Sequence, residues 1–214
     1  SIVVLHACCH NPTGADLSEA QWLEVVEVIR ARGLVAFIDM AYQGFADGIE
    51  PDALALRLFA ASGLQFFVSS SFSKSFSLYG ERVGALSIVT ASRDESARVM
   101  SQVKRVVRTN YSNPPTHGGA VVAAVLASPE LRKLWEEELA GMRERIRAMR
   151  TGLVDKLKAR GVAQDFAFVA RQRGMFSYTG LTAEQVERLK SEFGIYAVST
   201  GRICLAALNT RNLD

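Results

Sequence analysis

A single lysine, Lys74, stands among serines in the stretch SSSFSKSFSLYGERVG, which runs from Ser69 to Gly84. Arg82 follows it by eight residues. A compound with an aldehyde and a phosphate requires such a set, because an amine condenses with the carbonyl carbon while hydroxyls and a cation hold the phosphate. The stretch therefore predicts Lys74 as the amine, with Ser71 and Arg82 as phosphate ligands.

Three other side chains match what an aldehyde cofactor built on a pyridine ring would need. A carboxylate can keep the ring nitrogen protonated so that the ring accepts electrons, and Asp39 is the candidate. Tyr42 and Asn11 can hydrogen-bond the phenolic oxygen of the ring, which lowers the pKa of a Schiff base formed with the lysine.

Each of these residues taken singly has an ordinary structural explanation. A lysine among serines is usually a solvated loop residue, and Asp39 can simply cap the next turn. Arg82 can form a surface pair with its neighbour Glu81, which would stabilise the fold little. The stretch HNPTG, residues 10–14, is typical of a turn.

The cysteines and histidines indicate structure rather than metal chemistry. No spacing matches a disulfide framework or a metal-ligand motif, so no metal is predicted. His6 and His10 are interpreted as structural or supporting residues, and Cys8 and Cys9 as small buried residues. The low cysteine content favours a reducing compartment, and we expect a cytoplasmic protein.

The first half of the chain alternates strands with helices. Ser18 and Gln21 form a capping box that starts a helix, and Gly33 follows its end. Continuous apolar runs separated by helices imply a parallel sheet buried on both faces, with ligands beyond the carboxyl ends of the strands. The strands are expected at 2–6, 34–39, 65–70 and 83–89, with a further helix at 52–62.

The second half is mostly helical at first. Ser92 and Glu95 predict a capping box for a helix to about Arg108, which NYSNPP then ends. Apolar residues at helical spacing predict one long helix over 129–157, followed by a small α+β unit. We expect two domains, a cofactor domain over 1–128 and a bridging helix with a small domain over 129–214.

The bulk composition excludes little but is consistent with one large or two small globular domains. Of the 214 residues, 49% are hydrophobic, and 25 basic residues face 22 acidic ones. Without a basic block or an apolar run of membrane-spanning length, neither a nucleic-acid nor a membrane partner is expected. Both ends look cut, since the chain opens on a strand and stops where a helix would start.

The order of five motifs resembles the class I pyridoxal-phosphate aminotransferases, in their aspartate and aromatic amino-acid branch. The resemblance covers essentially the whole chain, and the spellings LYGER and GMFSYTG are more similar to the aromatic (tyrosine) enzymes. It implies an α/β fold: the later half of a fold type I large domain with a mostly parallel sheet, then a small C-terminal α+β domain. The motifs are HNPTG, DMAYQGF, SSSFSKSFSLYGERVG, RTNYSNPP and TGRICLAAL.

The resemblance also implies a role for each matched residue around the cofactor, pyridoxal 5'-phosphate. Lys74 would form the Schiff base and then carry the proton between the substrate and the cofactor. Asp39 would pair with the ring nitrogen, and Asn11 and Tyr42 would contact the ring oxygen. The peptide bond between Asn11 and Pro12 is a candidate cis bond.

The remaining matches concern the phosphate and the substrate. Ser71 and Arg82 would hold the phosphate. Arg202 would clamp the α-carboxylate of the substrate, and Arg108 would reach into the site of a neighbouring subunit. Phe176 would cover the pocket from the small domain.

The implied activity is a ping-pong transfer of an amino group from an aromatic or acidic amino acid to a 2-oxo acid such as 2-oxoglutarate, in a homodimer. Two alternatives stay open. A decarboxylase or lyase on the same fold would share Lys74 and Asp39, and a truncated fragment would turn nothing over. The second alternative arises because the family carries roughly as much chain again before Ser1.

Overall fold

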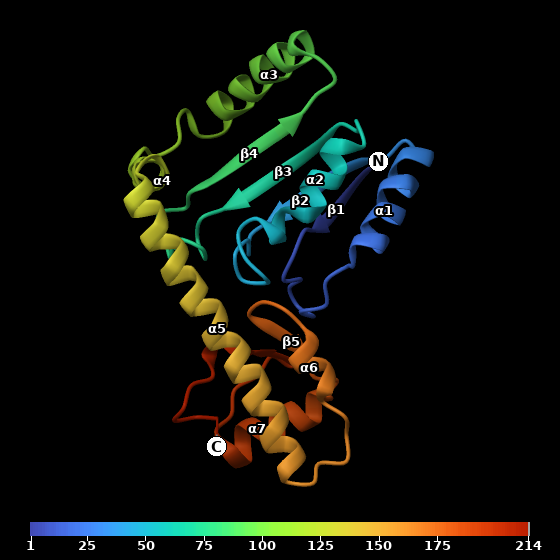
Figure 1. The fold of residues 1–214 in the computed structure, drawn as a ribbon, viewed down its shortest axis with the longest axis vertical. Coiled ribbons are helices and arrows are strands. Elements are labelled where there is room, and N and C mark those ends of the chain that lie inside the picture. The colour runs from blue at the N-terminus through green and yellow to red at the C-terminus, as the bar shows by residue number, and fades with distance from the viewer. Residues whose placement is uncertain (214) are drawn as a thin grey trace.

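The computed structural model describes residues 1–213 and places a four-stranded sheet in the first half of the chain. The strands lie side by side in sequence order (Figure 1). The first three are parallel to one another, and the fourth is antiparallel to its neighbour. They are β1 (Ile2–His6), β2 (Val35–Met40), β3 (Phe66–Ser71) and β4 (Gly84–Val89).

The prediction of a mostly parallel sheet is confirmed, and β4 is the strand that departs from the parallel arrangement. A parallel neighbour needs a crossover connection, usually a helix. The connection from β3 to β4, residues 72–83, contains turns and no helix. The chain therefore reverses, and the first residue of β4, Gly84, pairs with the last residue of β3, Ser71.

Two helices cover one face of the sheet. The capping box at Ser18 is present, and Trp22 and Phe59 pack edge to face beneath the helices, over the fully buried Ile38. These helices are α1 (Glu19–Ala31) and α2 (Leu54–Ala61), the latter preceded by the short 3-10 helix η1 (Pro51–Ala53).

The opposite face of the sheet is not buried by the described residues, which corrects the expectation of two buried faces. Val4 is 65% exposed, and Leu86 is 52% exposed. Since neighbours in register share a face, the side chains of His6 and Asp39 lie on this open side.

Three helices then lead away from the sheet: α3 (Arg93–Tyr111), α4 (His117–Ala127) and α5 (Pro129–Ala159). Ser92 caps α3 as predicted, but the Glu95 carboxylate accepts from the Ala91 N–H rather than from Ser92. The sequence analysis did not anticipate α4. The long helix α5 runs from α4 down to the C-terminal unit (Figure 1).

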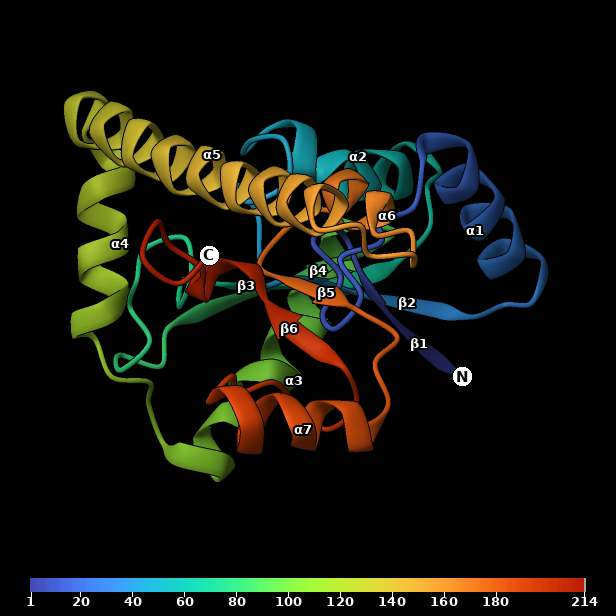
Figure 2. The same ribbon diagram turned by 90° about the horizontal axis from the view of Figure 1, so that it is seen from below.

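The C-terminal unit contains a two-stranded antiparallel sheet that lies between α5 and α7 (Figure 2). Its elements are α6 (Ala167–Arg171), β5 (Phe176–Tyr178), α7 (Ala183–Phe193), β6 (Arg202–Cys204) and the 3-10 helix η2 (Leu205–Ala207). A second hydrophobic core joins this unit to the loops after β1 and β2, through Cys9, Phe45, Leu139 and Leu205. A domain boundary after residue 128 stays a prediction. No helix of the described chain is long and apolar enough to cross a membrane.

Candidate functional site

The register of the parallel strands brings the predicted residues to one edge of the sheet. His6, Asp39 and Ser69 are neighbours across β1, β2 and β3. Asn11 and Tyr42 lie a few residues beyond the ends of β1 and β2. Because carboxyl ends of parallel strands meet at one edge, the loops that carry these side chains converge there.

The antiparallel fourth strand returns Arg82 to the same edge. Gly84 is opposite Ser71, so Arg82, two residues earlier, lies beyond the carboxyl end of β3. A parallel β4 would have placed Arg82 at the far edge. The reversal of the chain between β3 and β4 is therefore what brings Arg82 near Ser71.

Tyr42 lies at the centre of this group of predicted site residues. Its hydroxyl accepts a hydrogen bond from Asn11 Nδ2 at 3.3 Å. The Lys74 amine lies over its ring, with Nζ 4.8 Å from the centroid, and the Phe176 ring meets it edge to face at 6.2 Å. Residues from two other loops and from strand β5 thus contact one phenol.

The surroundings of Tyr42 raise its pKa above the ordinary value. Burial is the largest cause, and the negative charge of Asp39 adds to it, whereas the Asn11 hydrogen bond and the Arg202 charge lower it. The phenol therefore keeps its proton at neutral pH. Because the oxygen accepts from Asn11, that proton is available for donation to a ligand.

Asp39 has a neighbour, His6, for which the sequence predicts a structural or supporting role. His6 Nε2 lies 3.8 Å from Asp39 Oδ2, and His6 Nδ1 accepts from the Asn11 N–H at 3.4 Å. The histidine thereby connects the predicted carboxylate with the predicted amide. The signal that could have found it is its position at the end of β1, in line with the end of β2.

Arg202 and Phe176 reach the site from the two-stranded C-terminal sheet. Arg202 Nη1 donates to Asn11 Oδ1 at 3.0 Å, a contact across 191 residues of chain. Its guanidinium carbon lies 4.7 Å from the centre of the Phe176 ring, a cation–π contact. The two predicted substrate residues therefore support each other at the edge of the group.

The loop that carries Lys74 is anchored to α5. Ser73 and Ser75, which flank the lysine, are buried. Trp135 Nε1 donates to the Ser75 carbonyl oxygen at 2.7 Å, and the Trp135 ring stacks on Phe76 at 4.4 Å. Trp135 lies within the helix predicted over 129–157, but helical spacing alone does not predict its contact with this loop.

Ser71 and Arg82 make local contacts. The Ser71 hydroxyl accepts from the Ser73 N–H at 3.2 Å. Arg82 is exposed, has a positive φ of 52°, and donates to the Tyr79 carbonyl oxygen at 2.8 Å. A bound anion at this edge could take the guanidinium, whose present partner is a neutral carbonyl.

Arg108 is the one predicted residue that the structure does not bring to this group. It lies exposed on α3, beyond β4 (Figure 1), and donates to the Ser112 hydroxyl at 2.6 Å. The predicted cis bond between Asn11 and Pro12 is present.

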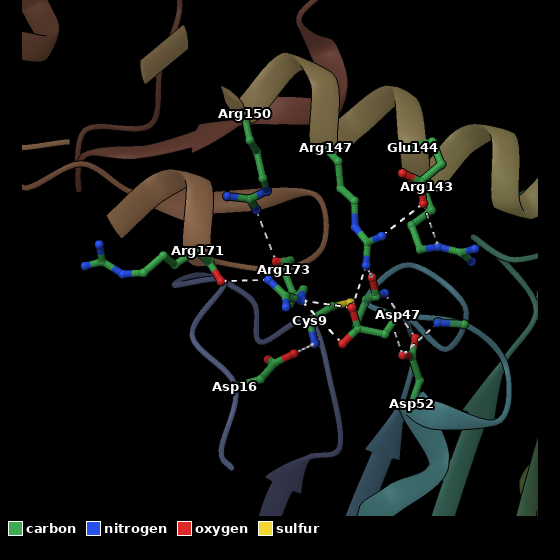
Figure 3. A network of polar contacts seen from close by, with 12 residues as sticks. Cys9, Asp16, Asp47, Asp52, Arg143, Glu144, Arg147, Arg150, Arg171 and Arg173 are labelled. Atoms are coloured by element: carbon green, nitrogen blue, oxygen red, sulfur yellow. Dashed lines mark hydrogen bonds and ion pairs between the residues drawn. The ribbon is translucent and has the colours of Figure 1, made fainter. Parts of the chain in front are cut away.

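Two buried charged residues shape the loops around the site (Figure 3). Asp52 accepts the backbone N–H groups of Gly44 and Ala46 on one oxygen and those of Asp47 and Gly48 on the other. It thereby fixes the loop that follows Tyr42.

Arg150 fixes backbone segments of the C-terminal unit by hydrogen bonds, as Asp52 fixes the loop after Tyr42. It is 1% exposed, and its guanidinium donates to the Ser177 hydroxyl and to four backbone carbonyls. Those carbonyls belong to Val169, Arg173, Gly174 and Phe176. The segment that presents Phe176 is therefore held from α5.

Comparison with known proteins identifies the family of the chain. The family pattern described as aminotransferase class I and II matches residues 1–214. The chain therefore belongs to the class I and II aminotransferase family.

Individual relatives resemble the chain over its whole length. It is 74% identical over 214 residues to an aspartate aminotransferase of Pseudomonas aeruginosa, covering 100% of this chain and 54% of that protein. An aromatic-amino-acid aminotransferase of Escherichia coli K12 is 54% identical, with the same coverage.

Among solved structures, an aromatic-amino-acid aminotransferase from Burkholderia pseudomallei, described as covalently bound to pyridoxal phosphate, superposes with a TM-score of 0.99 at 74% identity. The match covers 100% of this chain and 54% of that one. The chain thus spans about half the length of the relatives it matches.

Proposed function

We propose that this chain supplies the catalytic lysine and part of the cofactor pocket of a pyridoxal-phosphate-dependent aminotransferase. The observation that carries the proposal is the grouping of Lys74, Asp39 and Asn11 around Tyr42. An amine, a carboxylate, an amide and a phenol at one sheet edge are the donors and acceptors that the cofactor's substituents require. The covalent cofactor of the Burkholderia relative supports the same assignment.

When bound, pyridoxal phosphate supplies an aldehyde that accepts amino groups and a ring that withdraws electrons from a substrate carbon. Asp39, oriented by His6, would hold a proton on the ring nitrogen. Tyr42, protonated at neutral pH, would donate to the ring oxygen together with Asn11. The Lys74 amine would attach the cofactor and then move a proton to and from the substrate's α-carbon.

Arg82 and Ser71 would bind the phosphate, since a planar guanidinium matches a phosphate in a bidentate manner. Arg202 would take the α-carboxylate of the substrate in the same way. The Phe176 ring beneath the guanidinium and the Asn11 oxygen beside it restrict its orientation. Arg202 therefore acts as a preset carboxylate clamp.

The proposed reaction transfers an amino group from an aromatic or acidic amino acid to a 2-oxo acid such as 2-oxoglutarate. The two relatives at 74% identity carry an aspartate and an aromatic name, respectively. The likeness therefore supports both donor classes without ranking them. A homodimer, in which Arg108 serves the neighbouring site, and a cytoplasmic location remain predictions from the resemblance.

The activity is tested by incubating the chain with pyridoxal phosphate, tyrosine or aspartate, and 2-oxoglutarate, and measuring glutamate and the new 2-oxo acid. A parallel sample adds the part of the Pseudomonas relative that the chain does not match. We expect stoichiometric glutamate and 2-oxo acid in the mixed sample, lost in Lys74→Ala. Release of CO₂ or of another amine without glutamate would instead support a decarboxylase or lyase.

The substrate clamp is tested in the same assay with Arg202→Lys. A lysine keeps the charge but loses the two-point contact, so we expect a KM for the amino donor at least ten-fold higher. Arg211→Lys, an exposed arginine near the C-terminus, is the matched control and should leave KM unchanged. An unchanged KM in Arg202→Lys would contradict the assignment.

A further inference from the structure

Cys8 and Cys9 place two thiols together at the end of β1. They are 5% and 1% exposed, and both are free cysteines. The Cys8 thiol is the first cause of a raised pKa at Cys9, ahead of burial, so the two groups contact each other. Their sulfur atoms and a carboxylate oxygen of Asp52 all lie within 4.8 Å of one another.

Asp52 is a poor third ligand despite its proximity. Its two oxygens already accept four backbone N–H groups, at distances of 2.7, 3.0, 2.8 and 3.2 Å. Drawing an oxygen into a metal's coordination sphere would leave buried N–H groups unpaired. The donor set is therefore two sulfurs, too few for the tetrahedral site that Zn²⁺ prefers.

The two cysteines differ in what lies next to them. Cys8 lines an open cavity of about 510 Å³ between the sheet and the C-terminal unit, whose wall also contains Asp16 and Arg173. On the other side, the 173–174 segment closes over Cys9: a Cβ on Gly174 would lie 2.4 Å from the Cys9 Cβ. One sulfur thus adjoins the entry and the other is sealed.

A buried cation, Arg150, interacts electrostatically with Cys9. Arg150 donates to uncharged acceptors, its Nε has no hydrogen-bond partner, and burial lowers its pKa to about 10. A negative charge on Cys9 would offset this lowering. Figure 3 shows Arg150 and Cys9 on opposite sides of the loop that carries Arg173. Asp16, whose carboxylate accepts the Cys9 N–H at 2.7 Å, is the anion nearest to both Cys9 and Arg150 on this side.

We infer that Cys8 and Cys9 form a binding site for a soft, thiophilic ion of low coordination number, with Cu(I) as its representative. Thiolates select such ions, and two sulfurs complete a two-coordinate shell. Binding replaces two S–H bonds by two Cu–S bonds, releases two protons and involves no change of oxidation state. The product carries one negative charge, which the Arg150 guanidinium favours and the carboxylates of Asp16 and Asp52 oppose.

The test uses the chain with Cys204→Ser, because Cys204 is an exposed thiol that would bind copper on its own. Anaerobic titration against Cu(I)-bicinchoninate measures how much copper the chain removes from the coloured complex. We expect one equivalent per chain, falling to none in Cys8→Ser and in Cys9→Ser. Circular dichroism checks that these variants remain folded.

A second measurement needs no variant in the site. X-ray absorption of the copper-loaded Cys204→Ser chain should give a first shell of two sulfurs. A shell of nitrogen and oxygen only, or equal copper uptake by the folded Cys8→Ser and Cys9→Ser chains, would overturn the proposal. Neither readout depends on aminotransferase activity, so the two proposals fail independently.

Discussion

At the scale of single residues, Tyr42 is the side chain that several residues of the candidate site contact. It is a buried phenol contacted by an amide, an aromatic ring and the Lys74 amine, and its pKa responds to the charges around it. Its raised pKa keeps a proton donor at the point where the cofactor's ring oxygen is proposed to lie. The same shift has a measurable effect on stability.

Stability should fall more steeply above pH 10 in the parent chain than in Tyr42→Phe. The folded phenol holds its proton at pH values where the unfolded phenol, with an ordinary pKa of 10.0, has lost it. The unfolded state then binds fewer protons, so the free energy of unfolding decreases as pH rises, by at most about 1.4 kcal/mol per pH unit. Denaturant titrations from pH 9 to about 11 measure the slope.

The charged groups that face Tyr42 are Asp39, Tyr79 and Arg202, with the Lys74 amine over the ring. All are present in both chains, so the difference in slope isolates Tyr42. Tyr196→Phe, at a side chain 80% exposed, is the control and should retain the parent slope. Equal slopes in the parent and Tyr42→Phe would contradict a raised pKa.

At the scale of elements, side chains on the helices fix the loops that the strands and helices leave free. Asp52, in the 3-10 helix η1 just before α2, holds the loop after β2, and Trp135 on α5 holds the loop after β3. The two loops carry Tyr42 and Lys74. Their relative position therefore depends on hydrogen bonds from neighbouring elements as well as on the sheet.

Asp52→Asn should destabilise the chain by about 2–6 kcal/mol. An amide offers one acceptor oxygen in place of two and turns an NH₂ group toward backbone N–H donors, so two buried N–H groups lose their partner at about 1–3 kcal/mol each. The exposed Asp155→Asn on α5 is the control, expected within about 0.5 kcal/mol of the parent. Urea unfolding gives both values, and equal stability of the two variants would contradict this role.

Much of this level could be predicted from sequence, because it depends on local patterns. The capping box at Ser18 and the long apolar face of α5 are local signals, and both elements formed as expected. The direction of β4 could not be taken from its apolar run, since a buried run looks alike in both directions. The helix α4, with Gly118 and Gly119 in its first turn, resembles no amphipathic pattern.

At the scale of the whole molecule, the site depends on close packing of the C-terminal unit against the loops of the sheet. Gly14 and Gly174 both have positive φ, and a Cβ on either would lie 2.4 Å from an atom of the opposite segment. Asp47 pairs with Arg147 and Arg173 across the same junction (Figure 3). This junction sets how Phe176 and Arg202 meet Tyr42 and Asn11.

Gly174→Ala should therefore cost far more stability than Gly161→Ala. Both glycines have a left-handed backbone conformation, with φ of +76° and +69°. Each alanine variant therefore loses about 1–2 kcal/mol of stability to backbone strain. At Gly161 nothing lies within 4 Å, whereas at Gly174 the new methyl would collide with Cys9. The added overpacking is about 1–3 kcal/mol. Equal losses on thermal or urea unfolding would show that the junction is loose.

Contacts between distant parts of the chain could not be predicted from residue types alone. Asn11 and Arg202 touch across 191 residues, and nothing in their local sequence indicates the contact. The resemblance to a family, which records the order of motifs, placed both at the site. The resemblance gave no role to Trp135 or Arg150. Helical periodicity places them on α5 but does not reveal which loop a side chain supports.

The central claim is that Lys74 is the amine that attaches the cofactor. The most direct measurement treats the chain with pyridoxal phosphate, reduces the mixture with sodium borohydride and maps the added mass by peptide mass spectrometry. We expect the label on Lys74, abolished in Lys74→Ala and reduced in Asp39→Ala, with Lys133, an exposed lysine on α5, unlabelled as a control. A label spread evenly over surface lysines, or unchanged total labelling in Lys74→Ala, would contradict the account.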